Sequence, residues 1–135
     1  MLNICNKFIT LLTTNAPLVA IVPASSISIG PVDIVQETQA SLQMPQINIR
    51  PISEVVATVP RNTKQTRLQL DIWSRNSEME AQNIYEQILT ILDFQSYDQS
   101  TSHIWWQRLG GLSSSYETDV RLWHYSADFL IWSLN

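Results

Sequence analysis

Glu117 and Asp119 are the residues whose types and spacing come nearest to catalytic chemistry in this chain of 135 residues. They lie two positions apart in a segment expected to be a strand, so alternation along the strand would place both carboxylates on one face. Paired carboxylates can act as general acid and base. The same pair is also typical of a solvated strand face, and we favour that interpretation.

The other residues capable of catalysis or metal binding are isolated in the sequence. His103 and His124 have no further cysteine, histidine or carboxylate at ligand spacing. Cys5 is the only cysteine, which excludes an intrachain disulfide and fits a reducing compartment. The Gly110-Gly111 pair lacks the spacing and the Lys-Ser/Thr ending of a phosphate-binding loop. We therefore expect no catalysis, no metal and no cofactor.

The composition restricts the classes of partner. The net charge of -4 argues against nucleic-acid binding as the main role, because phosphate binding requires a basic surface. Only 15% of the residues are charged, against about 25% in typical domains. Such a neutral polar surface can be buried in contacts without desolvating charges, although a soluble monomer could have the same composition.

The length predicts one domain over residues 1–135, and the distribution of apolar residues predicts a soluble cytoplasmic protein. No stretch approaches the roughly 20 apolar residues that a membrane span needs. The first residues lack the basic start and unbroken apolar run of a signal peptide.

Residues 66–92 organise the predicted fold. Leu68, Leu70 and Ile72 alternate as one face of a strand. Ser77 and Glu80 then fit a capping box, in which the hydroxyl and the carboxylate satisfy free amides at the start of a helix. The expected apolar stripe of that helix contains Ala81, Ile84, Tyr85, Ile88, Leu89 and Leu92. A strand followed directly by such a helix gives a two-layer α+β unit.

The remaining segments supply the partners of this unit. Asn15 is expected to cap a second short helix, and Pro51 marks a strand end or a sheet edge. The predicted elements are helices at 2–14 and 18–22, strands at 26–29, 46–52, 103–109, 116–123 and 125–134, and a polar loop at 93–102. The prediction is an α+β fold, with a mostly antiparallel sheet packed against a central amphipathic helix and one or more N-terminal helices.

Residues 53–65 are expected to form a hairpin connection with a long tip. Residues 54–59 could extend the preceding strand. Arg61 and Lys64 place two of the eight basic residues in the tip, and Arg67 follows just beyond it. Most hairpin tips are merely solvated, but a basic tip in an acidic chain is also a candidate contact.

Tryptophan is unusually frequent, with five residues that all fall in predicted strands. Because Trp105 and Trp106 are adjacent, they must point to opposite faces of a strand, so either both sheet faces are covered or a tryptophan is exposed. Exposed tryptophan with little charge nearby is typical of interfaces. A platform for sugars or single-stranded nucleic acid is the alternative. We favour subunit contacts through Trp105, Trp106, Trp123 and Trp132.

The order of these elements resembles the tail-completion or tail-terminator proteins of long-tailed bacteriophages. The resemblance covers about residues 11–134 but is poor in residues 30–44 and 95–115. It depends on Pro45 before a strand, Asp71-Ile72-Trp73-Ser74 at a strand end, the helix at 81–92, and Ser126-Ala127-Asp128-Phe129-Leu130-Ile131-Trp132 in the last strand.

The resemblance implies a structural virion protein without catalytic activity. Such proteins form a ring, expected here to be a hexamer, that caps the tail tube, ends its elongation and docks to the head-completion or connector protein. The protein would be found in the tail or neck after assembly in the host cytoplasm. No membrane and no sequence-specific nucleic acid are implied, although the ring lumen leaves room for DNA to pass.

The hairpin is the candidate contact with the tube or a neighbouring subunit, and we expect its tip to become ordered on the axial face of the ring. The residues assigned to this contact are Glu54, Val55, Val56, Arg61, Asn62, Lys64 and Arg67. A tail-tube subunit or a head-side stopper is an alternative in the same class. A small α+β ligand-binding domain or enzyme using Glu117, Asp119 and the tryptophan surface is an alternative in another class.

Overall fold

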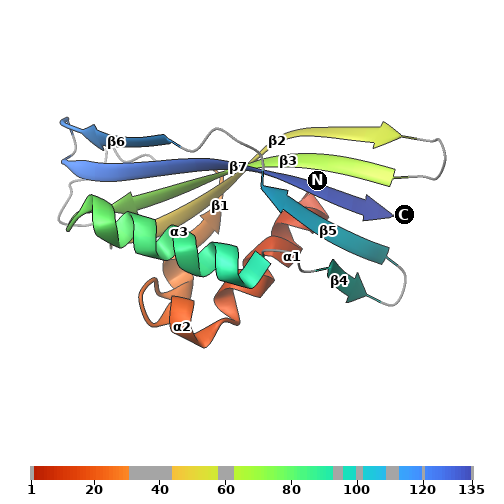
Figure 1. Ribbon diagram of the computed structural model, residues 1–135, viewed down its shortest axis with the longest axis horizontal. Helices are drawn as coiled ribbons and strands as arrows, with labels where there is room; N and C mark the ends of the chain where they lie inside the picture. The colour runs from red at the N-terminus through yellow and green to blue at the C-terminus, as the bar shows by residue number, and fades with distance from the viewer. Residues whose placement is uncertain are drawn as a thin grey trace.

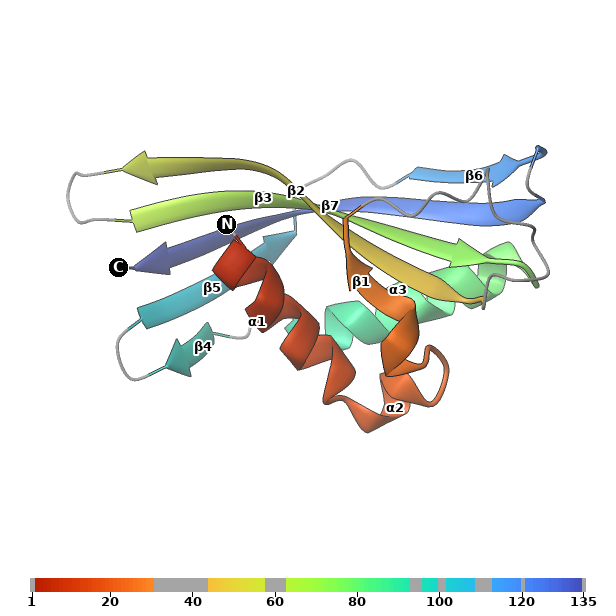
Figure 2. The ribbon, with the colours of Figure 1, turned by 180° about the vertical axis from the view of Figure 1, so that it is seen from behind.

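The computed structural model describes residues 2–30, 44–57, 63–92, 96–99, 102–108, 113–119 and 121–134. In this part of the chain, helices lie along one face of a strongly elongated sheet (Figures 1 and 2). The helices are α1 (Leu2–Thr13), α2 (Ala16–Val19) and α3 (Glu78–Leu92). The strands are β1 (Ile27–Ile29), β2 (Gln46–Ala57), β3 (Thr63–Ser74), β4 (Ser96–Gln99), β5 (Ser102–Arg108), β6 (Ser113–Glu117) and β7 (Leu122–Leu134). The predicted α+β class is confirmed.

The described strands form one seven-stranded sheet in the order β1-β2-β3-β7-β5-β4, and β6 pairs with the first half of β7. The β1–β2 pair is parallel, and the other pairs are antiparallel. The longest pairing joins β3 to β7, from Thr63 opposite Leu134 to Ser74 opposite Trp123. The last strand of the sequence is therefore central in the sheet.

The core lies between the helices and one face of this sheet. Phe8 of α1 packs edge-on against Phe129 of β7, with ring centroids 5.8 Å apart. Tyr85 of α3 packs on Tyr125 of the same strand at 5.3 Å. Both helices therefore cover the same face of β7, since side chains two positions apart along a strand share a face. The expected strand faces are buried at Leu68, Leu70, Ile72, Tyr125, Ala127, Phe129 and Ile131.

Helix α3 buries nearly the stripe that its sequence predicts. Ala81, Ile84, Tyr85, Ile88 and Leu92 are buried, as expected, but Ile91 occupies the remaining buried position. Leu89 is only partly buried at the edge of the core. The described helices include none that is long and apolar enough to cross a membrane.

The first turn of α2 forms as predicted. The Leu18 amide donates a hydrogen bond of 3.0 Å to the Asn15 side-chain oxygen. Proline at the start of the helix has no amide to satisfy, so Pro17 fits this turn.

The predicted capping box of α3 is only half correct. The Glu80 amide donates to the Ser77 hydroxyl at 3.1 Å, so Ser77 is the N-cap. The Glu80 carboxylate instead accepts from the Ser74 hydroxyl at 2.8 Å and from the Asn76 side-chain amide at 2.9 Å. Ser74 is the buried last residue of β3. Its proximity diverts the carboxylate, which thereby ties the end of the strand to the start of the helix.

Two predictions for the second half of the chain are wrong. Residues 93–102 are not all loop, because they contain β4, which pairs with β5. This strand is short and lies at the sheet edge, so its polar sequence carries no apolar alternation. Residues 116–123 are not one strand, because a turn separates β6 from β7 and Arg121 has a left-handed φ of 55°. Asp119 consequently lies in a turn and does not share a strand face with Glu117.

Strand β2 extends beyond its predicted end to Ala57. Its pairing with β1 covers only Ile47 to Ile49, so no described strand adjoins that side of β2 further along. Pro51 lies in this edge portion, where a missing amide is tolerated. A register shift follows between Pro51 and Ser53. The expectation of an edge position is confirmed.

Candidate functional site

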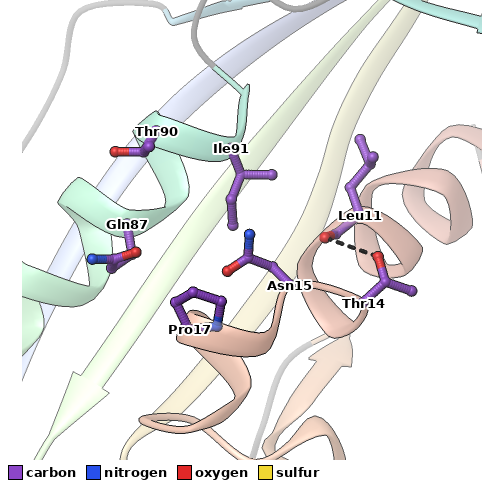
Figure 3. Close-up of a pocket in the computed structure, with 7 residues that line it drawn as sticks. All are labelled: Leu11, Thr14, Asn15, Pro17, Gln87, Thr90 and Ile91. Carbon is purple, nitrogen blue, oxygen red and sulfur yellow. Dashed lines mark hydrogen bonds between the residues drawn. The ribbon is translucent and has the colours of Figure 1, made fainter.

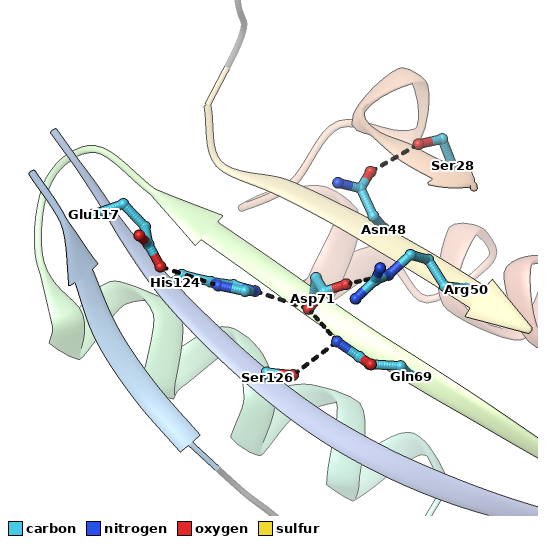
Figure 4. A network of polar contacts seen from close by, with 8 residues as sticks. All are labelled: Ser28, Asn48, Arg50, Gln69, Asp71, Glu117, His124 and Ser126. Atoms are coloured by element: carbon cyan, nitrogen blue, oxygen red, sulfur yellow. Dashed lines mark hydrogen bonds and ion pairs between the residues drawn. The ribbon is translucent and has the colours of Figure 1, made fainter. Parts of the chain in front are cut away.

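Polar side chains cluster on the sheet face opposite the helices (Figure 4). Residues between the buried positions of β3 and β7 point away from the core, because side chains alternate along a strand. Asp71 is central among them, and only 5% of its side chain is exposed. This Asp71 cluster also contains Arg50 from β2, Gln69 from β3, and His124 and Ser126 from β7.

Asp71 receives polar contacts from three strands. One carboxylate oxygen accepts a hydrogen bond of 3.0 Å from Arg50 Nε. The other accepts from Gln69 Nε2 at 3.0 Å and lies 2.7 Å from His124 Nε2. Desolvation by burial raises the pKa of Asp71, but the hydrogen bonds from His124 and Gln69 and the positive charge of Arg50 outweigh it, so the pKa is lowered.

His124 connects this carboxylate to the β6–β7 hairpin. Its ring stacks on Trp73 with centroids 3.9 Å apart and planes inclined by 5°. Its Nδ1 atom lies 3.7 Å from Glu117 at the end of β6. An aspartate that orients a histidine is also found in catalytic triads, but here the second ring nitrogen faces Glu117 rather than a nucleophile. The arrangement is suited to holding the hairpin against β3.

The structure therefore places the residues that the sequence singled out for catalysis in separate environments. Glu117 contacts His124, whereas Asp119 is exposed in the turn. The side chain of His103 and the pair Gly110-Gly111 lie outside the described residues. Cys5 is buried in the core, and burial raises the pKa of its thiol. Among the described residues, no group of three or more His, Cys, Asp or Glu side chains could hold a metal ion.

The outer part of the β2–β3 hairpin extends past the helical layer (Figures 1 and 2). We call residues 52–57 of β2 and 63–67 of β3 the arm. Val55 and Val56 are 56% and 53% exposed, and Ile52 is 47% exposed. Because adjacent strand residues point to opposite faces, the two valines show that the outer end of the arm is open on both faces, whereas Thr66, nearer the core, is fully buried.

The charged residues of the arm are engaged in ion pairs. Nζ of Lys64 lies 3.9 Å from Oε1 of Glu54 across the hairpin. Nη2 of Arg67 lies 2.6 Å from Oδ2 of Asp128 in β7. Arg61 and Asn62, which were also assigned to this contact, lie outside the described residues. The most exposed large side chains of the arm are thus aliphatic.

The tryptophans assigned to subunit contacts occupy different environments. Trp123 is half-buried and packs on the exposed Tyr116, with ring centroids 4.8 Å apart. Trp132 is half-buried. The backbones of Trp105 and Trp106 lie in β5, opposite Trp132 and Ile131 of β7, but their side chains are outside the described part of the structure.

An open pocket of about 350 Å³ lies where the end of α1, the start of α2 and the end of α3 meet (Figure 3). Its lining is uncharged and consists of Leu11, Thr14, Asn15, Pro17, Gln87, Thr90 and Ile91. Asn15 already caps α2, and the Thr14 hydroxyl donates to the carbonyl of Thr10 at 2.7 Å. The pocket thus has no acid, base or metal ligand with which to do chemistry.

The profile of the family described as "Tail completion protein gp17" matches residues 8–133. The chain belongs to this family. The predicted resemblance is confirmed, and the protein is a structural component of a phage tail. A comparison with curated proteins gives no match.

The fold is also similar to that of a chain in the structure entitled "Virion of native gene transfer agent (GTA) particle". The TM-score is 0.58 at 11% sequence identity, and the match covers 95% of this chain and 92% of the other. At that identity the likeness concerns the fold.

Proposed function

We propose that this tail completion protein assembles into a hexameric ring that caps the tail tube, ends its elongation and joins the tail to the head connector. Family membership supports a role in tail completion. The observation that carries the more specific role is the arm, which extends beyond the helical layer and exposes Ile52, Val55 and Val56. Aliphatic side chains exposed on both faces of a two-stranded ribbon are suited to burial against a partner.

We further propose that the arm contacts the tail tube or a neighbouring subunit. Its contact residues would be Glu54, Val55, Val56, Arg61, Asn62, Lys64 and Arg67, as expected from the sequence. Because Lys64 already pairs with Glu54 and Arg67 with Asp128, the aliphatic residues would be the main source of affinity; ion pairs at the protein surface contribute little. The head-completion or connector protein would bind another face of the ring, and DNA would pass through the lumen.

The test is a complementation assay in phage that lack this protein. The variant Val55→Lys/Val56→Lys replaces both exposed valines of the arm. Lysine should prevent their burial and leave tails of irregular length that do not join heads. The matched control is Met79→Lys at the start of α3, where the side chain is 69% exposed and lies off the arm.

Electron microscopy of tails and the titre of infectious particles are the measurements. The control variant should restore tails of normal length and infectious particles. Normal head–tail joining by the arm variant would contradict the proposal. Purified protein that stacks into long tubes would indicate a tube subunit instead of a terminator.

A further inference from the structure

We propose that neighbouring subunits of the ring join edge to edge, with the β2 edge of one arm pairing with β4 of the next copy. This inference rests on the proposed ring and names the surface that closes it. The β2 edge comprises residues 52–57, and β4 comprises Ser96–Gln99.

Both strands lie at open margins of the described sheet. Strand β1 adjoins β2 only at Ile47 to Ile49, and the Gly30 amide donates to the Ile49 carbonyl at 2.8 Å where this pairing ends. Strand β4 is the last strand on the opposite side. The arm and β4 lie at the same end of the molecule, on opposite sides of β3, β7 and β5 (Figure 1). Open strand edges present backbone donors and acceptors that another strand can satisfy.

From Ser53 onward the β2 edge contains neither proline nor a register shift, two of the features that usually prevent such pairing. Natural edge strands are blocked by charged side chains such as lysine, by proline, by bulges or by charged residues that point inward. In β2 the proline precedes the arm, and the register shift falls at Ile52, the first residue of the arm. Of residues 52–56, Glu54 is the charged one, and it pairs with Lys64 within the same hairpin. The exposed Val55 and Val56 are β-branched residues, which favour strands.

The occupant we favour is a second copy of this chain because each copy carries both open edges and the two edges differ. Contact between unlike surfaces repeats from copy to copy and closes into a ring when the rotation allows. A β2–β2 contact would instead be two-fold and would stop at a dimer, leaving β4 open. Successive antiparallel pairings from β2 through β3, β7 and β5 to β4 make β2 and β4 run in the same direction. A rotation about an axis along the strands would therefore give a parallel junction.

Cross-linking between engineered cysteines tests this junction. The native Cys5 is buried, so it leaves the surface free of native thiols. In the variant Val55→Cys/Tyr97→Cys, a short bismaleimide should link copies into a ladder that ends at the closed ring. The variant Val55→Cys/Gln99→Cys tests the same junction with β4 shifted by two residues relative to β2. Met79→Cys/Tyr97→Cys is the control, because Met79 is exposed but lies off the arm.

Light scattering and electron microscopy of the unmodified protein, alone and with tail tubes, keep the two proposals apart. If no ring forms in either condition, the proposed function fails. If rings form but neither arm pair gives a ladder, the edge-to-edge junction is wrong while the function stands. A dimer from Val55→Cys alone, or an equal ladder from the control, would also overturn the junction.

Discussion

The Nε2 atom of His124 lies 2.7 Å from Oδ1 of Asp71, and this contact joins β7 to β3 on the face without helices (Figure 4). The two residues are diagonal neighbours, because Asp71 is directly opposite Ser126 in the sheet register. Arg50 reaches the same carboxylate diagonally from β2, where Asn48 is the direct partner. Diagonal contacts of long side chains are within reach across adjacent strands. Asp71 thus connects three strands on the sheet face opposite the helices.

Replacing Asp71 with asparagine should destabilise the protein by about 1.5–3 kcal/mol, the usual range for hydrogen bonds to a charged group. Asparagine keeps the shape but removes the charge that Arg50 and His124 contact, and its amide nitrogen cannot accept a hydrogen bond. Urea unfolding followed by circular dichroism measures the change. Asp119→Asn is the control, because Asp119 is exposed in a turn, and its stability should stay within about 0.5 kcal/mol of wild type. Equal stability of the two variants would show that the Asp71 cluster contributes nothing.

The contribution of Asp71 should also depend on pH. Its pKa is lower in the folded protein than its ordinary value, because hydrogen bonds from His124 and Gln69 and the charge of Arg50 outweigh the effect of burial. A lowered folded-state pKa gives stability that is present above the unfolded pKa, about 3.9, and is lost as pH falls through the folded value. The difference in unfolding free energy between wild type and Asp71→Asn should therefore shrink below about pH 4. A difference that stays constant from neutral to acidic pH would contradict this assignment.

Truncating the aromatic contact between α1 and the sheet tests the core. Phe129→Ala removes a ring that packs on Phe8, and a buried Phe→Ala change costs about 3–5 kcal/mol. Tyr116→Ala should cost much less, because Tyr116 is 45% exposed on β6. Thermal and urea unfolding of both variants gives the comparison, and similar losses would mean that the Phe8–Phe129 contact is not a main part of the core.

Two separate polar contacts at the start of helix α3 can be tested by substitution: the Ser77 cap and the Glu80 carboxylate. Ser77→Ala removes the N-cap and should cost about 1 kcal/mol. Glu80→Ala removes a carboxylate that contacts Ser74 and Asn76, which should loosen the junction between β3 and α3. Amide hydrogen exchange distinguishes the two, since Ser77→Ala should act on the first turn of α3 and Glu80→Ala also on the end of β3. Exchange that changes only within the helix in both variants would favour the simple capping box.

The sequence predicted the parts of the fold that depend on local periodicity. Leu68, Leu70 and Ile72 alternate within a few residues, so the strand and its buried face follow directly. The same holds for the faces of α3 and β7. The Asp71–His124 contact could not be predicted, because the two residues are 53 positions apart and meet only through the register between β3 and β7. The only sequence signal was polar residues at alternate positions of neighbouring strands.

The errors in the sequence prediction have local causes. The turn that separates β6 from β7 contains neither glycine nor proline, and Arg121 takes the left-handed φ there. The polar residues of β4 form a strand through backbone pairing with β5, which a hydrophobic pattern does not report. Glu117 and Asp119 were consequently placed on one strand face, and the Glu117–His124 contact was missed.

Substitutions in the arm should affect assembly without changing the stability of the folded protein. In Val55→Lys/Val56→Lys the altered side chains are already more than half exposed, so folding should change by no more than about 0.5 kcal/mol per substitution. Assembly should nevertheless be lost, because each lysine would have to be desolvated when the arm is covered. Urea unfolding of the isolated protein and light scattering in the presence of tail tubes measure the two properties separately. Loss of both together would mean that the valines support the fold itself, and retention of both would mean that the arm stays solvated in the assembled tail.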